Sequence, residues 1–378
     1  MTRQLHADIG TTAFAAQPPM HAAPSAQERI SAWLLGRNVQ QVDGGVAGWV
    51  DAKGQAAYVY PEITGYYLQW LAWRASGSVA HAFLARRADA AQQWLKRWLG
   101  GAGAPLTRIH STPGIDDWRN RAVFAFDVAM VLRGLTAAAR MNLVSADPAV
   151  VKRLNDELER LVAHDGQLDA CSVHADGADF PRRWSTQRGP FLAKAAAGIE
   201  VASASLPGVS TALRTAAAAT FDASIEALTA APHAETHPQL YALEGYLAWP
   251  GHPQFAARLP AMMTAFEGLV ASTLAQGRVP ESQREAGTAR LDIVAQMLRV
   301  GVLLGHHGGS TVLASLTRPL VAALETAVLP DGAMPFARHG DFALQRNAWV
   351  AMFATQALAW NAAQPSTLRH VAKAPAIV

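Results

Sequence analysis

The stretch "YVYPEITGYYLQWLAW", residues 58–73, places one carboxylate, Glu62, among tyrosines and tryptophans. A carboxyl group in apolar surroundings keeps its proton to a higher pH, because burial disfavours the charged form. A carboxyl with a raised pKa is suited to general acid or base catalysis. Glu62 is therefore the first candidate for a catalytic residue. The structural alternative is a helix-starting carboxylate that is favoured by the helix dipole alone.

Other carboxylates offer a partner for Glu62. The segment "GIDDWRNR" holds Asp116 and Asp117, which either cap a following helix or act as an acid or base. Asp292 begins a later apolar segment, and Asp127 lies one or two turns into another. Burying Asp127 is costly without a partner, so it either pairs with an arginine or belongs to the floor of a site. We predict Glu62, Asp116, Asp117 and Asp292 as catalytic residues.

The histidines and the cysteine indicate no metal or cofactor. "HAETH" places His233 and His237 four residues apart, a spacing that puts both on one helix face. Pro232 and Pro238 bracket the pair and no third ligand is evident, so we predict no metal site and no cofactor. The single cysteine, Cys171, excludes an internal disulfide and a cysteine-based zinc site.

Arginines gather in the polar segments between the predicted helices and outnumber lysines there. A guanidinium binds carboxylate, sulfate or phosphate in a bidentate manner and tolerates partial desolvation. Pairing with nearby acids accounts for part of the set, and the remainder indicates an anionic ligand. These arginines are Arg108, Arg119, Arg121, Arg182, Arg183, Arg188, Arg284, Arg290, Arg338 and Arg346.

Two kinds of apolar segment alternate along the chain, at a spacing that fits a two-helix repeat. The first kind is apolar nearly all round, which predicts buried helices at 61–75, 121–141, 189–203, 237–249, 289–305 and 346–362. The second kind is amphipathic, which predicts helices with one solvated face at 25–42, 79–100, 147–164, 207–229, 252–274 and 310–329.

Six inner and six outer helices predict an all-α fold, an (α/α)6 toroid. We expect one toroid domain at 25–362, a flexible lead at 1–24 and a C-terminal tail at 363–378, with no sheet larger than a hairpin. The alternative is an open α-solenoid of helix pairs. The lack of a solvated face on the inner helices favours the closed ring.

In such a ring, every loop from an outer helix to the next inner helix opens at the same end. These loops are the long, polar ones, and long loops on a rigid scaffold are where function concentrates. We therefore predict a single site there. Its predicted ligand-binding residues are Tyr58, Tyr60, Tyr66, Trp118, Arg119, Arg121, Trp184, Arg188, His237, Tyr241, Arg290 and Arg346.

Composition excludes several classes of partner. The formal charge is +3 and no dense run of Lys and Arg occurs, so we expect no nucleic-acid binding. No uninterrupted apolar span reaches about 18 residues, so we expect no membrane insertion. The first residues lack the apolar core of a secretory signal, which makes the cytoplasm the expected compartment.

The segments "FAFDVAMVLRGL", "HPQLYALEGYLAW" and "LDIVAQMLRVGVLL", with the Asp165-Gly166 and Asp331-Gly332 turns, carry a resemblance. Residues 25 to 362 resemble the six-hairpin (α/α)6 toroid superfamily of carbohydrate-active proteins. That superfamily includes glycoside hydrolases, polysaccharide lyases, uronyl epimerases and N-acylglucosamine 2-epimerases. Gln239 and Tyr241 stand where a 2-epimerase would have histidines, which argues against simple 2-epimerase chemistry.

The resemblance and the candidate residues together predict a carbohydrate-active enzyme for an acidic glycan. In the leading hypothesis, paired carboxylates hydrolyse a glycosidic bond. In the second, a uronate lyase or sugar epimerase abstracts a proton with His110, His237 or Tyr241, while an arginine neutralises the carboxylate. In the third, the protein binds an acidic saccharide without catalysis, as a component of polysaccharide biosynthesis. The sequence leaves the oligomeric state open.

Overall fold

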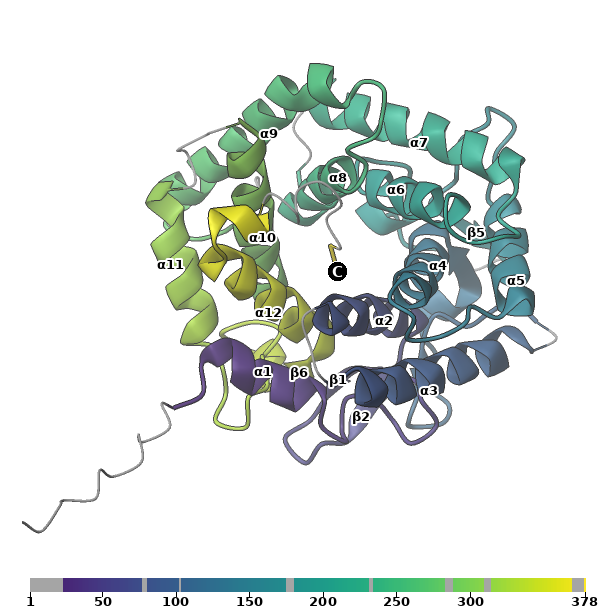
Figure 1. Ribbon diagram of the computed structural model, residues 1–378, viewed down its shortest axis with the longest axis horizontal. Helices are drawn as coiled ribbons and strands as arrows, with labels where there is room; N and C mark the ends of the chain where they lie inside the picture. Colours follow the sequence, from purple (N-terminus) through teal and green to yellow (C-terminus); the bar gives the residue numbers. More distant parts are fainter. Residues whose placement is uncertain are drawn as a thin grey trace, which may run out of the picture.

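The computed structural model describes residues 23–76, 80–101, 103–174, 180–230, 234–282, 288–308, 314–368 and 377–378. The all-α fold class is confirmed (Figure 1). The inner helices are α2 (Pro61–Ala75), α4 (Ala125–Arg140), α6 (Leu192–Ser203), α8 (Thr236–Ala248), α10 (Leu291–Gly308) and α12 (Ala348–Ala362). The outer helices are α1 (Ala26–Leu34), α3 (His81–Leu99), α5 (Pro148–Glu159), α7 (Thr211–Ala230), α9 (Phe255–Gln276) and α11 (Ala314–Glu325).

The inner helices form a closed ring. Each packs on the next in chain order, and α12 packs back on α2 (Figure 1). The outer helices surround them, so the closed (α/α)6 toroid is confirmed over the open solenoid. Burial follows the sequence pattern, since every residue of α8 is buried while α3 buries only one side.

The aromatic residues of 58–73 take different positions before and along α2. Trp70 is wholly buried in the ring wall, where its Nε1 donates to Thr355 Oγ1 at 3.0 Å. Trp73, one turn later, packs against the same core and is partly exposed. Tyr60 precedes the helix as its N-terminal cap residue, at the end of the ring where the long loops lie.

The expectation of no sheet larger than a hairpin was wrong. Strands β3 (Ile109–His110), β2 (Ala56–Val59), β1 (Ala47–Val50) and β6 (Arg346–Asn347) form a four-stranded antiparallel sheet in that order. The pairing of β6 with β1 joins the loop before α12 to the loop before α2, so the sheet fastens the ring where it closes. A second, two-stranded sheet pairs β4 (Ala122–Phe124) with β5 (Cys171–Val173).

The two ends of the chain differ in how much of them the structure describes. Residues 1–22, most of the predicted flexible lead, lie outside the described residues. In the predicted tail, Ile377 and Val378 are wholly buried, and the C-terminal end lies at the centre of the ring (Figure 1).

In the described part of the chain, no helix combines the length and apolar character that crossing a bilayer requires.

The inner ring depends on close approach of the backbones of α2 and α4. A Cβ added at Gly65 would lie 2.5 Å from the carbonyl oxygen of Met130, and one at Gly134 would lie 2.3 Å from that of Gly65. Neither neighbour is a flexible side chain, so any larger residue forces the two helices apart.

We therefore expect Gly65→Ala and Gly134→Ala each to lower the free energy of unfolding by about 1–3 kcal/mol. Gly268→Ala on the exposed side of α9 is the matched control, because a Cβ there meets no atom within 4 Å. That control should raise stability by up to about 1 kcal/mol through helix propensity. Denaturant unfolding of the three variants measures this, and equal effects at all three positions would contradict the close-packing account.

Candidate active site

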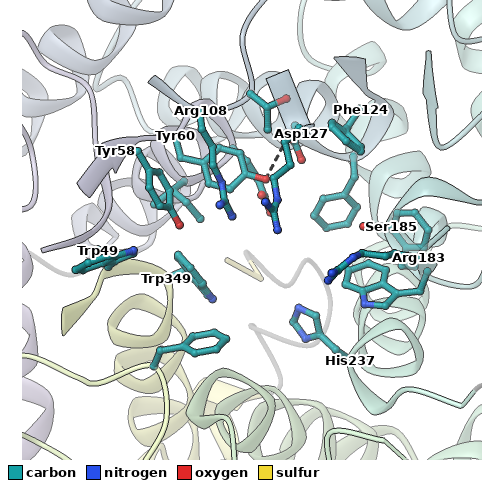
Figure 2. Close-up of a pocket in the computed structure, with 18 of the residues that line it drawn as sticks. Trp49, Tyr58, Tyr60, Arg108, Phe124, Asp127, Arg183, Ser185, His237 and Trp349 are labelled. Atoms are coloured by element: carbon teal, nitrogen blue, oxygen red, sulfur yellow. Dashed lines mark hydrogen bonds between the residues drawn. The ribbon is translucent and has the colours of Figure 1, made fainter. Parts of the chain in front are cut away.

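A cavity of about 440 Å³ opens at the long-loop end of the ring (Figure 2). Its walls are mostly aromatic and carry two carboxylates and four arginines. The lining residues are Trp49, Tyr58, Tyr60, Glu62, Ile63, Thr107, Arg108, Trp118, Arg119, Phe124, Phe126, Asp127, Arg183, Trp184, Ser185, Phe191, His237, Tyr241, Arg290, Phe336, Phe342, Gln345 and Trp349. Concave, largely apolar sites with a few converging polar groups are typical of small-molecule binding.

Two carboxylic acids from neighbouring inner helices meet in one wall of the cavity. Glu62 lies in the first turn of α2 and Asp127 in the first turn of α4. The Tyr60 hydroxyl donates to Asp127 Oδ2 at 3.2 Å (Figure 2), and Tyr60 also acts on the Glu62 carboxyl, whose pKa it lowers. The packing of α2 on α4 thus brings both acids to the same phenol.

The pKa of each of the two carboxyl groups is raised. Burial raises the pKa of Glu62 to about 7, against the opposing effects of Tyr60, Lys194 and Arg108. Burial, and then the charge of Glu62, raise the pKa of Asp127 well above its usual range. The charge of each carboxylate opposes ionisation of the other, so the pair holds a proton near neutral pH.

Arg108 sits beside this pair. Its guanidinium lies over the Tyr58 ring at 4.4 Å and the Tyr60 ring at 5.5 Å, and it contacts Asp117 Oδ2 at 3.4 Å. Asp117 itself caps the short helix η1 (Trp118–Arg121) and holds Arg119 at 3.1 Å. Asp117 therefore fixes two arginines of the cavity from behind it.

The opposite side of the cavity carries His237, at the start of α8. Its Nδ1 lies 2.5 Å from Gln296 Oε1, and the amide nitrogen of Gln296 donates to Glu244 at 3.2 Å. The amide oxygen therefore faces His237, which places the imidazole proton on Nδ1 and leaves Nε2 as an acceptor. Burial, and then Arg290, lower the pKa of His237 to about 3, so the ring is neutral.

Arg290 and Arg183 also reach the cavity but differ in their partners. Arg290 pairs with Asp292 at 2.6 Å and with Glu281 at 3.2 Å, and it lies 4.9 Å over the Phe336 ring. Asp292 also accepts from Trp349 Nε1 at 3.2 Å. Arg183 points into the cavity (Figure 2) and forms no ion pair with any carboxylate of the described chain.

The structure brings most of the predicted site residues together. Those that line the cavity are Glu62, Tyr58, Tyr60, Trp118, Arg119, Trp184, His237, Tyr241 and Arg290. Among the predicted catalytic acids, Glu62 alone is in the lining. Asp117 and Asp292 lie directly behind it, where they hold cavity arginines. Asp116 is exposed and pairs with Arg121.

The remaining predicted ligand-binding residues do not line the cavity. Tyr66 is buried below it, with its hydroxyl 3.4 Å from that of Tyr241. Arg188 pairs with Asp165 and Asp169. Arg346 pairs with Asp331 and donates to the carbonyl oxygen of Asp51. His233 of the histidine pair and Arg284 lie outside the described residues.

Several cavity residues were not among the predicted site residues. Asp127 had a signal, a carboxylate inside an apolar helix, but the sequence left its partner open. No sequence signal marks Trp49, Phe336 and Trp349 as cavity residues, because isolated aromatic residues of this kind also occur in hydrophobic cores. In the described chain, no group of three or more His, Cys, Asp or Glu side chains is arranged to hold a metal ion.

The comparisons with known proteins identify the fold. No protein-family model matches the sequence, and no curated protein matches it. Among solved structures, a sugar epimerase from a ruminal bacterium superposes with a TM-score of 0.68 at 8% identity, covering 87% of this chain and 95% of that one. Cellobiose 2-epimerase from Bacillus thermoamylovorans gives 0.65 at 10% identity, with 88% and 97% covered. An unsaturated glucuronyl hydrolase specific for heparin gives 0.57 at 12% identity, with 89% and 96% covered.

These similarities establish the (α/α)6 toroid as the fold of this chain, as the sequence predicted. Identities of 8% to 12% reach no further than the fold. The residues of the cavity, rather than the fold, determine the chemistry.

The buried carboxyl of Glu62 predicts a pH-dependent cost in stability. Because the pKa of Glu62 is raised from 4.5 to about 7, the folded protein binds this proton more tightly than the unfolded chain does. The free energy of unfolding should therefore fall as pH rises between these values. Glu62→Gln removes this cost, and the variant should exceed the wild type by up to about 3 kcal/mol above pH 7.

Denaturant unfolding from pH 4 to pH 8 measures the difference between the two proteins. The difference should be near zero at pH 4, where Glu62 is protonated in both states. A difference that stays constant over this range would contradict the raised pKa.

Proposed function

We propose that this protein is a carbohydrate-active enzyme that acts on an acidic saccharide by acid–base catalysis. The observation that carries the proposal is the Glu62–Tyr60–Asp127 group in the wall of an aromatic cavity. The surrounding aromatic faces suit the apolar faces of sugar rings, and the acid pair offers one proton and one charge at neutral pH. The named structural relatives, two sugar epimerases and a glucuronyl hydrolase, support a saccharide substrate, and the last of them supports an acidic one.

The leading reaction is hydrolysis of a glycosidic bond. The protonated member of the Glu62–Asp127 pair would donate to the leaving oxygen as that bond breaks. The ionised member would take a proton from an attacking water or stabilise the positive charge on the sugar ring. Tyr60 can support either assignment, because its hydroxyl donates to an ionised carboxylate and accepts from a protonated one.

The arginines support an acidic substrate. Arg183 reaches the cavity without a carboxylate partner in the described chain, so its guanidinium is available to an anion. Arg108 adds a charge next to the acid pair, and its Nε is buried and lacks a hydrogen-bond partner among the described atoms. An uronate carboxylate or a sulfate would satisfy both the charge and the donor geometry.

A second reaction class is proton abstraction at a sugar carbon, as in an epimerase or isomerase. The observation that favours it is the neutral His237 ring, whose Nε2 is left as an acceptor by the Gln296 contact. The low pKa makes this imidazole a weak base, which places the class second. Binding without turnover is the remaining alternative.

Product analysis with acidic oligosaccharides separates these classes. Hydrolysis releases a new reducing end, whereas epimerisation or isomerisation in D2O incorporates deuterium at the reacting carbon. A lyase yields an unsaturated product. Binding in the absence of all three products would contradict the proposal of an enzyme.

Substitutions in the acid pair test the assignment of the acid and base. Glu62→Gln and Asp127→Asn keep the shape of each side chain and remove its titration, so turnover should fall by about 10²- to 10⁴-fold. Affinity should change far less, because the rings and arginines remain. Asp156→Asn on the outer helix α5 is the control, and it should retain wild-type turnover. A folded Glu62→Gln protein with unchanged turnover would remove Glu62 from the mechanism.

Arg183 tests the acidity of the substrate. Losing a charge-assisted contact of about 1.5–3 kcal/mol predicts that Arg183→Leu weakens binding of an acidic saccharide by about 10- to 100-fold. Binding of a neutral analogue should be unchanged. Arg182→Leu is the matched control, because this neighbouring arginine is exposed and does not line the cavity. Equal losses for acidic and neutral ligands would contradict recognition of an anion by Arg183.

A further inference from the structure

A cluster of charges without solvent exposure lies beneath the cavity, and the reaction described above does not use it. Lys194 of α6, Glu244 of α8 and Arg299 of α10 are all fully buried. Lys194 Nζ donates to Glu244 Oε2 at 2.8 Å, and Arg299 Nε donates to Glu244 Oε1 at 2.7 Å. Two cations thus share a single carboxylate at the centre of the ring.

The last residues of the sequence complete the surroundings of Lys194. Its Nζ also donates to a main-chain oxygen of Val378 at 3.1 Å. The Val378 nitrogen in turn donates to Gln356 Oε1 at 3.1 Å, and Ile377 beside it is wholly buried. The Lys194 side chain is therefore held between Glu244 of α8 and the buried Val378.

On its other side, Lys194 faces the floor of the cavity. Its Nζ lies 4.7 Å from the centre of the Tyr66 ring and 4.8 Å from that of Tyr241, a range in which a cation is attracted to an aromatic ring. The two phenol oxygens are 3.4 Å apart, and Tyr241 lines the cavity. Lys194 thus supports the two tyrosines from below.

The charge balance around Glu62 gives Lys194 a second effect. The cations that act on the Glu62 carboxyl are Lys194 from below and Arg108 from the rim, while Asp127 is the anion beside it. The titratable tyrosines around it are Tyr60, Tyr58, Tyr66 and Tyr241, and Glu62 contributes to the raised pKa of each. Burial lowers the pKa of Lys194 to about 7, against the opposing effect of Glu244, so its ammonium group is fully charged on the acid side of neutrality. There the buried cations Lys194, Arg299 and Arg133 together outweigh Glu244, and the layer beneath Glu62 carries an excess of positive charge.

We propose that Lys194 is a positioning residue of the active site, which supports the Tyr66–Tyr241 floor and supplies the buried positive charge that stabilises ionised Glu62. This role rests on the proposed acid–base function of Glu62. Lys194 itself does not line the cavity, so it acts through the tyrosines and through its field.

The test is the titration of the acid pair in the folded protein, which requires no substrate. The carboxylic-acid band of Glu62 is identified in infrared spectra as the band that Glu62→Gln lacks, and its intensity is followed with pH. Lys194→Met keeps the length of the side chain and removes its charge. We expect the midpoint of the band to rise by about one pH unit, a tenfold gain in proton affinity.

Lys194→Gln provides a second variant, because its amide can still donate to Glu244 while the charge is lost. Lys152→Met, on the exposed face of α5, is the matched control and should leave the midpoint unchanged. A folded Lys194→Met or Lys194→Gln protein with the wild-type midpoint would overturn the proposal. A purely structural role of Lys194 under Tyr66 and Tyr241 would lower the thermal unfolding midpoint and leave the infrared midpoint of Glu62 unchanged. That result would also contradict the proposal.

Activity then separates this inference from the function on which it rests. If Glu62 is the acid or base, the pH–rate profile of Lys194→Met should move upward with the infrared midpoint. Unchanged turnover in Glu62→Gln would defeat the proposed catalytic role of Glu62, and the infrared midpoint would still decide whether Lys194 sets its ionisation.

Discussion

Two carboxylic acids beside one phenol, in a cavity wall made mostly of aromatic rings, are the constraint on which this site depends. Glu62 and Asp127 cannot both ionise easily, because burial and mutual repulsion oppose it. Their meeting requires α2 and α4 to pack closely enough that a Cβ on Gly65 or Gly134 would collide with the opposite backbone. The glycines that weaken each helix are thus what bring the acids together. Tyr60 completes the arrangement because it precedes α2 in the strand-to-helix connection.

The sequence was a good guide wherever a feature repeated, and a poor one where it did not. The alternation of all-apolar and amphipathic segments predicted the inner and outer helices, since burial depends on periodicity over many residues. The four-stranded sheet was missed because its strands are two to four residues long and pair across the ring closure. No local pattern reports that β6, some 300 residues later in the chain, lies beside β1.

The contrast between local patterns and long-range contacts also explains which site residues could be predicted from the sequence. Glu62 and its tyrosines are neighbours in sequence, so a local stretch revealed them. Asp127 became its partner only through helix packing, whereas Asp117 and Asp292, which looked equally promising, are held by arginines behind the wall. Ion pairing likewise separates the arginines, because Arg188 and Arg346 are bound by loop acids while Arg183 remains open to the cavity. A sequence shows which charged residues are present, and the fold determines which of them form ion pairs with each other.

The balance of forces at Glu62 shows why its surroundings extend below the cavity. Burial favours the neutral acid, while the N-terminal end of α2 favours the anion, because a helix dipole is positive there. Arg108 from the rim and Lys194 from below act in the same direction as the dipole. Burial without Tyr60 and these opposing charges would keep Glu62 protonated to a higher pH, and full solvation would ionise it at a lower one. An acid that exchanges its proton near neutrality therefore needs both the dry wall and the buried cations, which makes the polar layer at the centre of the ring part of the site's chemistry.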